Sequence, residues 1–153
     1  MNFNAWNIAY MAGAAFAGML IPIQTGYNAQ LGRALQGPIY STIAVFIAGL
    51  VALAIFALVT QTQLPPASMA ARAPFVSWFA GGLLGAIYII MLTVLVPRLG
   101  AAPTVAFVVM GQLLCSTIID HFGLLGFPEH AASPQRLAGL ALIAGGVALV
   151  RLF

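Results

Sequence analysis

Five long apolar stretches, separated by short polar segments, account for nearly all of this 153-residue chain. Four of them exceed the ~18 apolar residues that mark a transmembrane helix, and their continuous runs are far too long for buried strands. The strands of a membrane barrel would be about 10 residues long and would alternate in polarity, which these stretches do not. The sequence therefore predicts an all-α integral membrane protein with five transmembrane helices.

Proline marks where most of the predicted helices begin. At the first helical position its missing N–H costs no hydrogen bond, and its fixed φ suits the helix. Four prolines stand at the start of an apolar stretch: Pro38, Pro74, Pro103 and Pro134. Ser133 is also well placed to cap the last helix. The predicted spans, most of which match the ~30 Å hydrocarbon core, are about 6–31, 38–60, 74–96, 103–123 and 134–153.

The first predicted span is less regular than the others. It contains Pro22 and Gly26, and it is too long to cross a bilayer as one rod without strong tilt, so we expect a kink or break there. Two connecting segments, 61–73 and 124–132, are longer than the rest. Neither is long enough to hold a second domain, so residues 1–153 are predicted to form a single membrane domain.

The charged residues are few and evenly divided. They make up 5% of the chain, and the formal charge of +3 comes from five single arginines, with no lysine, against two acidic residues. Arginines spread in this way are typical of membrane-interface anchors, and they do not favour binding to nucleic acid. Two of them fall on one side of the predicted membrane and three on the other, Arg72 and Arg136 against Arg33, Arg98 and Arg151. So weak a bias allows insertion in both orientations, although Arg33 and Arg98 could also set a single one.

Two amides in the first span are candidates for function, because polar groups in hydrocarbon are costly. Gln24 and Asn28 lie four residues apart, share one helix face and follow Pro22. Such a face can bind a polar solute by donating and accepting hydrogen bonds at once. It can equally hold neighbouring helices together. Both interpretations stay open at this point.

The fourth predicted span carries a second polar stripe. Gln112, Ser116 and Asp120 recur every four residues on an otherwise apolar helix. Asp120 and the adjacent His121 lie near the end of the span, where a carboxylate and an imidazole could couple transport to protons. The alternative is that both anchor the helix end, with Asp120 paired to an arginine such as Arg33.

Catalytic and metal-binding motifs are absent from the sequence. There is no HExxH, no CxxC, no phosphate-binding glycine loop and no serine with an evident base. The lone Cys115 excludes an intrachain disulfide and argues against a metal site. We therefore expect no enzymatic activity, no cofactor and no bound metal.

Three segments resemble the YdcZ family of the drug/metabolite transporter superfamily: PIQTGYNAQLG at 22–32, PRLGAA at 97–102 and GQLLCSTIIDHFG at 111–123. The resemblance implies a five-helix, multi-pass protein of the bacterial inner membrane that acts as an exporter. It also implies that this chain is one half of a 5+5 inverted-repeat transporter, since larger relatives carry two inverted five-helix halves. Some members of the family are thought to be dual-topology proteins or oppositely oriented pairs. The membrane-embedded glutamate of the four-helix multidrug exporters has no counterpart in the first span.

Together these observations predict a transporter that exports small molecules by alternating access. Its partner would be an inverted copy of itself, as an antiparallel dual-topology homodimer, or an oppositely oriented paralogue. The first, third and fourth predicted helices of both copies would line a central cavity, with solute contacts from Gln24, Asn28, Tyr88, Gln112 and Ser116. The alternative function is a non-transporting membrane scaffold or accessory subunit, in which the polar stripes only hold helices together.

Overall fold

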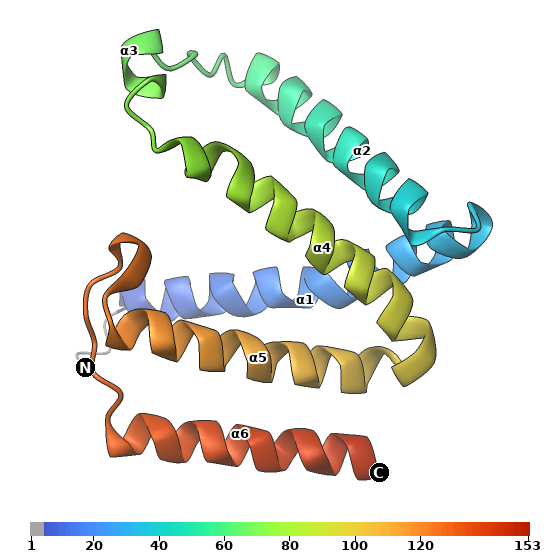
Figure 1. Ribbon diagram of the computed structural model, residues 1–153, viewed down its shortest axis with the longest axis vertical. Helices are drawn as coiled ribbons and strands as arrows, with labels where there is room; N and C mark the ends of the chain where they lie inside the picture. Colours follow the sequence, from blue (N-terminus) through green and yellow to red (C-terminus); the bar gives the residue numbers. More distant parts are fainter. Residues whose placement is uncertain (1–4) are drawn as a thin grey trace. The chain divides into compact units, whose positions relative to one another are not determined.

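The computed structural model describes residues 5–153, and these residues form helices and no strands (Figure 1). In chain order the elements are α1 (Ala5–Ala34), α2 (Pro38–Val59), the short α3 (Ala67–Ala70), α4 (Phe75–Leu99), α5 (Ala101–His121), the 3-10 turn η1 (Leu124–Gly126) and α6 (Pro134–Leu152). Five of these helices are long and apolar enough to cross a membrane, namely α1, α2, α4, α5 and α6. The predicted all-α fold with five spans is therefore confirmed.

Prolines open two of the long helices, as the sequence indicates. Pro38 is the first residue of α2 and Pro134 is the first residue of α6. Ser133 caps α6, because its hydroxyl oxygen accepts a hydrogen bond from the backbone N–H of Arg136 at 3.3 Å. That bond satisfies one of the backbone donors that every helix leaves without a partner in its first turn.

The other two prolines do not mark the first helical residue. Pro74 precedes α4, which starts at Phe75, while α5 starts at Ala101 and takes Pro103 into its first turn. Proline is tolerated there because the first four N–H groups of a helix have no intrahelical acceptor. A single residue, Gly100, separates α4 from α5 at a φ of 88°, a backbone region that glycine enters without strain.

Of the kink or break expected in the first span, the break is absent. α1 continues as one α-helix of 30 residues from Ala5 to Ala34, with Pro22 inside it. Proline removes one backbone donor, and the remaining hydrogen bonds carry the helix past that point. At a rise of about 1.5 Å per residue, α1 is ~45 Å long and has to tilt to lie within a bilayer.

The chain divides into two compact units, the first ending at Arg98 and the second beginning at Leu99. In the first unit α1 packs against α2, and α4 closely approaches α1 at Gly32. A Cβ added at Gly32 would lie 2.6 Å from Thr93 Cγ2 and 3.4 Å from Ser41 Oγ. Small and hydroxyl-bearing residues allow helix backbones to approach in this way. They dominate the buried set of this unit: Thr25, Asn28, Ala29, Gly32, Ser41, Thr42, Leu92 and Thr93.

In the second unit α5 and α6 pack side by side, and η1 packs on α5 (Figure 1). Near the start of the segment between the two helices, Gly123 has a φ of 58°, which lies in the left-handed region. In both units most large apolar side chains lie on the surface. In water such a surface would be costly, whereas in a bilayer it faces lipid.

Candidate functional site

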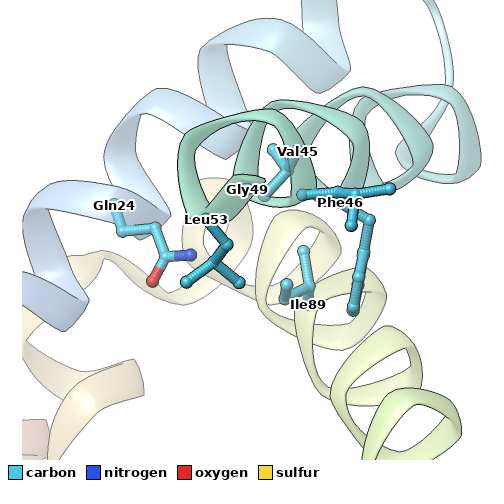
Figure 2. Close-up of a pocket in the computed structure, with 7 residues that line it drawn as sticks. Gln24, Val45, Phe46, Gly49, Leu53 and Ile89 are labelled. Atoms are coloured by element: carbon cyan, nitrogen blue, oxygen red, sulfur yellow. The ribbon is translucent and has the colours of Figure 1, made fainter. Parts of the chain in front are cut away.

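An open, groove-like cavity of about 340 Å³ lies among α1, α2 and α4 within the first unit, and most of its lining residues, Gln24 among them, are exposed (Figure 2). We call it the α1–α2–α4 cavity. Its volume falls at the lower end of the range found for small-molecule sites. α2 supplies most of the lining, with side chains from one helix face, and the full set is Gln24, Val45, Phe46, Gly49, Leu50, Leu53 and Ile89.

Two glycines help to shape this cavity. Gly49 lies in its wall, and a Cβ added there would meet no atom within 4 Å. Gly85 of α4 lies outside the lining but supports it, because a Cβ at that position would come 3.4 Å from the Phe46 ring. The missing side chain at Gly49 thus leaves space inside the cavity, and the Phe46 ring lies beside the α4 backbone at Gly85.

Gln24 is the one polar side chain among the seven residues of the lining. Its amide extends from α1 into the cavity towards Leu53 (Figure 2). It makes no hydrogen bond to any other residue that the structure describes. A primary amide offers two N–H donors and an oxygen acceptor, and leaving them unpaired in an apolar environment is costly. The amide is therefore available to a molecule that enters the cavity.

Asn28 lies one turn further along α1 and is only 7% exposed. Its amide likewise has no hydrogen-bond partner among residues 5–153. The neighbouring buried hydroxyls differ, because each donates to a carbonyl about one turn earlier in its own helix. These are the hydroxyls of Thr25, Ser41, Thr42 and Thr93, at 2.7, 3.0, 2.7 and 2.8 Å. Of the polar groups at this junction, the amide is thus the one still able to bind something else.

Tyr88 is the third sequence candidate in the first unit. It precedes the cavity residue Ile89 on α4 but does not line the α1–α2–α4 cavity itself. Its hydroxyl oxygen is buried and has no hydrogen-bond partner within the described part of the chain. Buried hydroxyls are normally paired, so this one is an exception that a ligand or a partner chain could satisfy.

Gln112 and Ser116 lie one turn apart on α5, in the second unit, and both are exposed. Neither side chain has a hydrogen-bond partner in the described structure. The nearby hydroxyl of Thr117, in contrast, donates to the Leu113 carbonyl oxygen at 2.8 Å. The polar stripe predicted on this helix is present as an exposed face, with an amide and a hydroxyl both able to bind.

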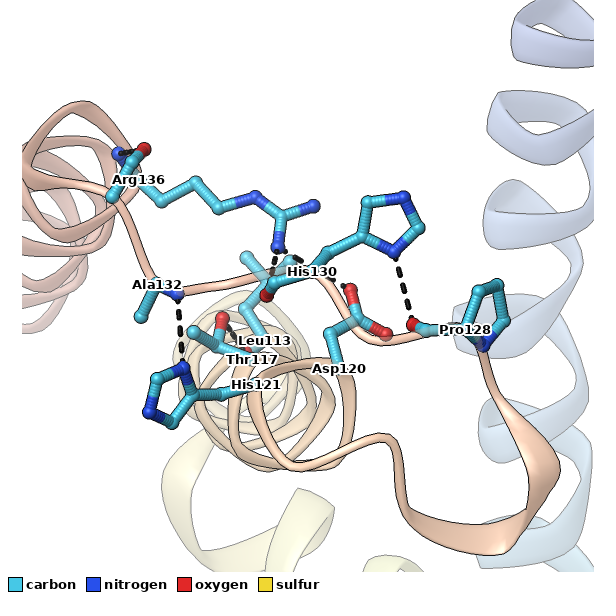
Figure 3. A network of polar contacts seen from close by, with 9 residues as sticks. Leu113, Thr117, Asp120, His121, Pro128, His130, Ala132 and Arg136 are labelled. Atoms are coloured by element: carbon cyan, nitrogen blue, oxygen red, sulfur yellow. Dashed lines mark hydrogen bonds and ion pairs between the residues drawn. The ribbon is translucent and has the colours of Figure 1, made fainter.

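Asp120, at the end of α5, forms an ion pair in which its Oδ2 lies 3.6 Å from Arg136 Nη1 (Figure 3). The arginine that pairs with Asp120 in the second unit is thus Arg136, where Arg33 was the example given from the sequence. The same arginine donates to the His130 carbonyl oxygen at 3.3 Å, and the His130 N–H donates to the Asp120 carbonyl oxygen at 2.7 Å. Both side chains of the ion pair are partly exposed, and such pairs contribute about 0–1 kcal/mol.

His121 also takes part in folding the segment that follows α5. Its Nδ1 accepts a hydrogen bond from the Ala132 N–H at 3.2 Å, so the ring proton is carried by Nε2 in this arrangement (Figure 3). The ring meets that of Phe122 edge-on, with the centroids 4.7 Å apart. Asp120 and His121 thus hold segment 122–133 against the end of α5, a geometry that favours an anchoring role. Across residues 5–153, no three His, Cys, Asp or Glu side chains are grouped so that they could hold a metal ion.

Sequence reasoning found the polar side chain of the cavity and missed its walls. The lining residues that α2 supplies are all apolar or glycine, and beyond Thr42 the helix is apolar all round, so no polarity pattern distinguished its cavity face. One usable signal of the cavity was the spacing of Phe46, Gly49 and Leu53. It places a glycine between two large side chains on the same helix face, which leaves a gap there. The pairing of Asp120 with Arg136 had no local signal, because it depends on how the intervening segment folds.

Five long apolar helices, whose large apolar side chains mostly lie on the surface of each unit, define a multi-pass membrane protein. The family model described as "Putative inner membrane exporter, YdcZ" matches residues 9–149. The chain belongs to this YdcZ family, which confirms the resemblance seen in the three sequence segments and places the protein in the inner membrane. No curated protein and no solved structure gave a match.

Proposed function

We propose that this chain moves small molecules across the inner membrane by alternating access, in the direction of export. The observation that carries the proposal is the unpaired Gln24 amide inside an otherwise apolar cavity. Hydrocarbon-embedded polar groups without a structural partner are a common feature of solute pathways. The membership of an exporter family supports the same function.

The active form that we propose is an antiparallel homodimer, in which the two copies provide the inverted halves of one transporter. Five spans place the two ends of the chain on opposite sides of the membrane, and the arginines divide two against three between those sides. Such a chain has little to fix one orientation.

The solute contacts are proposed separately for each unit. In the first unit they are Gln24 in the α1–α2–α4 cavity, the buried amide of Asn28 and the unpaired hydroxyl of Tyr88. In the second unit they are Gln112 and Ser116 on the exposed face of α5. These side chains share one property: none of their polar groups has a hydrogen-bond partner among the residues that the structure describes.

Two measurements test this function. Reporters fused to the C-terminus, one active only inside the cell and one only outside, should both give signal if the protein inserts both ways. In reconstituted vesicles loaded with a panel of small solutes, the wild type should release at least one solute, and the variant carrying Q24A and N28A should assemble but release it slowly.

The scaffold alternative gives the opposite pattern. Under that alternative the double variant loses assembly, measured as dimer cross-linking, and no solute moves in the wild type. The dimer proposal fails separately, if every copy has one orientation and no partner of opposite orientation is found.

A further inference from the structure

We infer that the solute recognised by the α1–α2–α4 cavity is uncharged, with an apolar body and a carboxamide-like group that both donates and accepts hydrogen bonds. This inference rests on the proposed transport function and adds the class of substrate to it. Three properties of the cavity lead to it: its lack of charge, the chemistry of its one polar group and its size.

The first property is the absence of charge from the cavity. None of its seven lining residues is ionisable. The two acidic residues of the whole sequence stand at positions 120 and 129, in the second unit, and Asp120 is already paired with Arg136. An organic cation in the cavity would lose its hydration without gaining a counter-charge, and an anion would meet no cation. An uncharged solute avoids this cost.

The second property is the hydrogen-bonding character of Gln24. Its amide presents donors and an acceptor side by side, and all of them are free of partners in residues 5–153. A ligand that only accepts would leave the Gln24 oxygen unpaired, and one that only donates would leave the N–H groups unpaired. A carboxamide pairs with both at once, because its own oxygen and N–H₂ lie in the same arrangement.

The third property is the size and shape of the apolar part. The cavity volume of about 340 Å³ is the space of roughly ten water molecules. Leu53, Phe46 and Ile89 surround the space beyond the Gln24 amide (Figure 2). A fused aromatic ring or a branched hydrocarbon of comparable size would replace water or lipid against these side chains, which adds to the affinity in proportion to the apolar area that is buried.

The test uses the full-length purified protein in detergent micelles and three probes with one naphthalene body. The probes are 2-naphthamide, 2-naphthoate and a naphthyl-trimethylammonium salt, and binding is measured by equilibrium dialysis against protein-free micelles. We expect the amide to bind at least tenfold more tightly than either ion. Q24L should weaken amide binding about tenfold, since one hydrogen-bonded pair is lost. Q24E should shift the preference towards the cation.

Two further variants identify the site of binding. G49L fills the cavity wall and should abolish binding of the amide, whereas Q30L changes an exposed α1 amide outside the lining and should leave it unchanged. Circular dichroism and size-exclusion profiles show whether each variant is folded.

Three outcomes overturn the inference: equal or tighter binding of the cation by the wild type, no binding of the amide to folded protein, or binding that neither Q24L nor G49L reduces. The last result would mean that a lipid chain or another surface holds the probe. Binding is measured without any membrane gradient, so a protein that binds the amide but moves no solute would contradict the proposed transport and not this specificity.

Discussion

Gly32 of α1 faces Thr93 of α4 so closely that a Cβ at position 32 would come 2.6 Å from the Thr93 Cγ2 methyl. The methyl group therefore occupies the space that any other residue at position 32 would need. In a bilayer, helices are not driven together by the hydrophobic effect, so their association depends on van der Waals packing. Close approach of the two backbones increases that packing. The contact also determines how near α4, with Ile89, comes to the other walls of the α1–α2–α4 cavity.

Substitution G32A should destabilise the protein. The Thr93 hydroxyl donates to the Ile89 carbonyl oxygen at 2.8 Å, and its β-branched side chain has little freedom to turn away, so overpacking should cost about 1–3 kcal/mol. T93S removes the methyl, keeps the hydroxyl and should restore most of the loss in the double variant. Thermal unfolding in micelles measures both effects. G18A is the control, because a Cβ there meets nothing within 4 Å; equal losses in G32A and G18A would contradict the packing argument.

Substitution Y88F should leave the stability of the folded chain unchanged or raise it by about 1 kcal/mol, because a buried hydroxyl without a partner is removed. If the Tyr88 hydroxyl binds the transported solute, Y88F should also lower the affinity of the protein for that solute. Unfolding and ligand binding are measured on the same preparation. Y10F, which alters a tyrosine that is 73% exposed, provides the matched control. Unchanged affinity in Y88F would remove Tyr88 from the proposed solute contacts.

Asp120 should act as an anchor and not as a coupling group. D120N and R136Q should each lower stability by less than ~1 kcal/mol, and a double-mutant cycle should show that their effects are not additive. Flux driven by a proton gradient should respond equally to both single variants. If D120N alone abolishes that flux while R136Q leaves it intact, the carboxylate couples transport to protons.

The cap of α6 is expected to contribute measurably to stability. S133A removes the acceptor for the Arg136 N–H and should cost about 0.5–2 kcal/mol. Hydrogen exchange should show the loss as faster exchange in the first turn of α6. S77A, at an exposed position near the start of α4, serves as the control and should change neither quantity. Unaltered exchange at Arg136 in S133A would mean that the hydroxyl does not cap the helix in solution.

The span pattern was readable from the sequence because hydrophobic length and proline position are local properties. Pro38 and Pro134 begin their helices as predicted, while Pro74 and Pro103 differ by one or two positions because the first turn and the residue before it both tolerate proline. The continuity of α1 past Pro22 depends on the hydrogen bonds of the surrounding turns, which a single residue does not reveal. Local pattern thus gives the existence of a helix more reliably than its ends.

The candidate site was readable only in part. Gln24 and Asn28 stand out because an amide in an apolar run is unusual, whereas Phe46 and Gly49 look like any other residues of α2. What makes them part of a cavity is the approach of α4, set by contacts between residues far apart in the chain. The ion pair of Asp120 has the same origin, since segment 122–133 folds back to bring Arg136 near.

The buried hydroxyls of the first unit carry a mechanical consequence. Thr25, Ser41, Thr42 and Thr93 each bond within their own helix, so none of these four bonds ties one helix to another. In hydrocarbon, a bond broken between helices finds no water to replace it. A tilt of α1 against α2 or α4 breaks none of these four bonds. Only the steric fit of the side chains at the helix contacts opposes it. The helices can therefore slide past one another without breaking any of these four bonds, because each hydroxyl is already satisfied within its own helix.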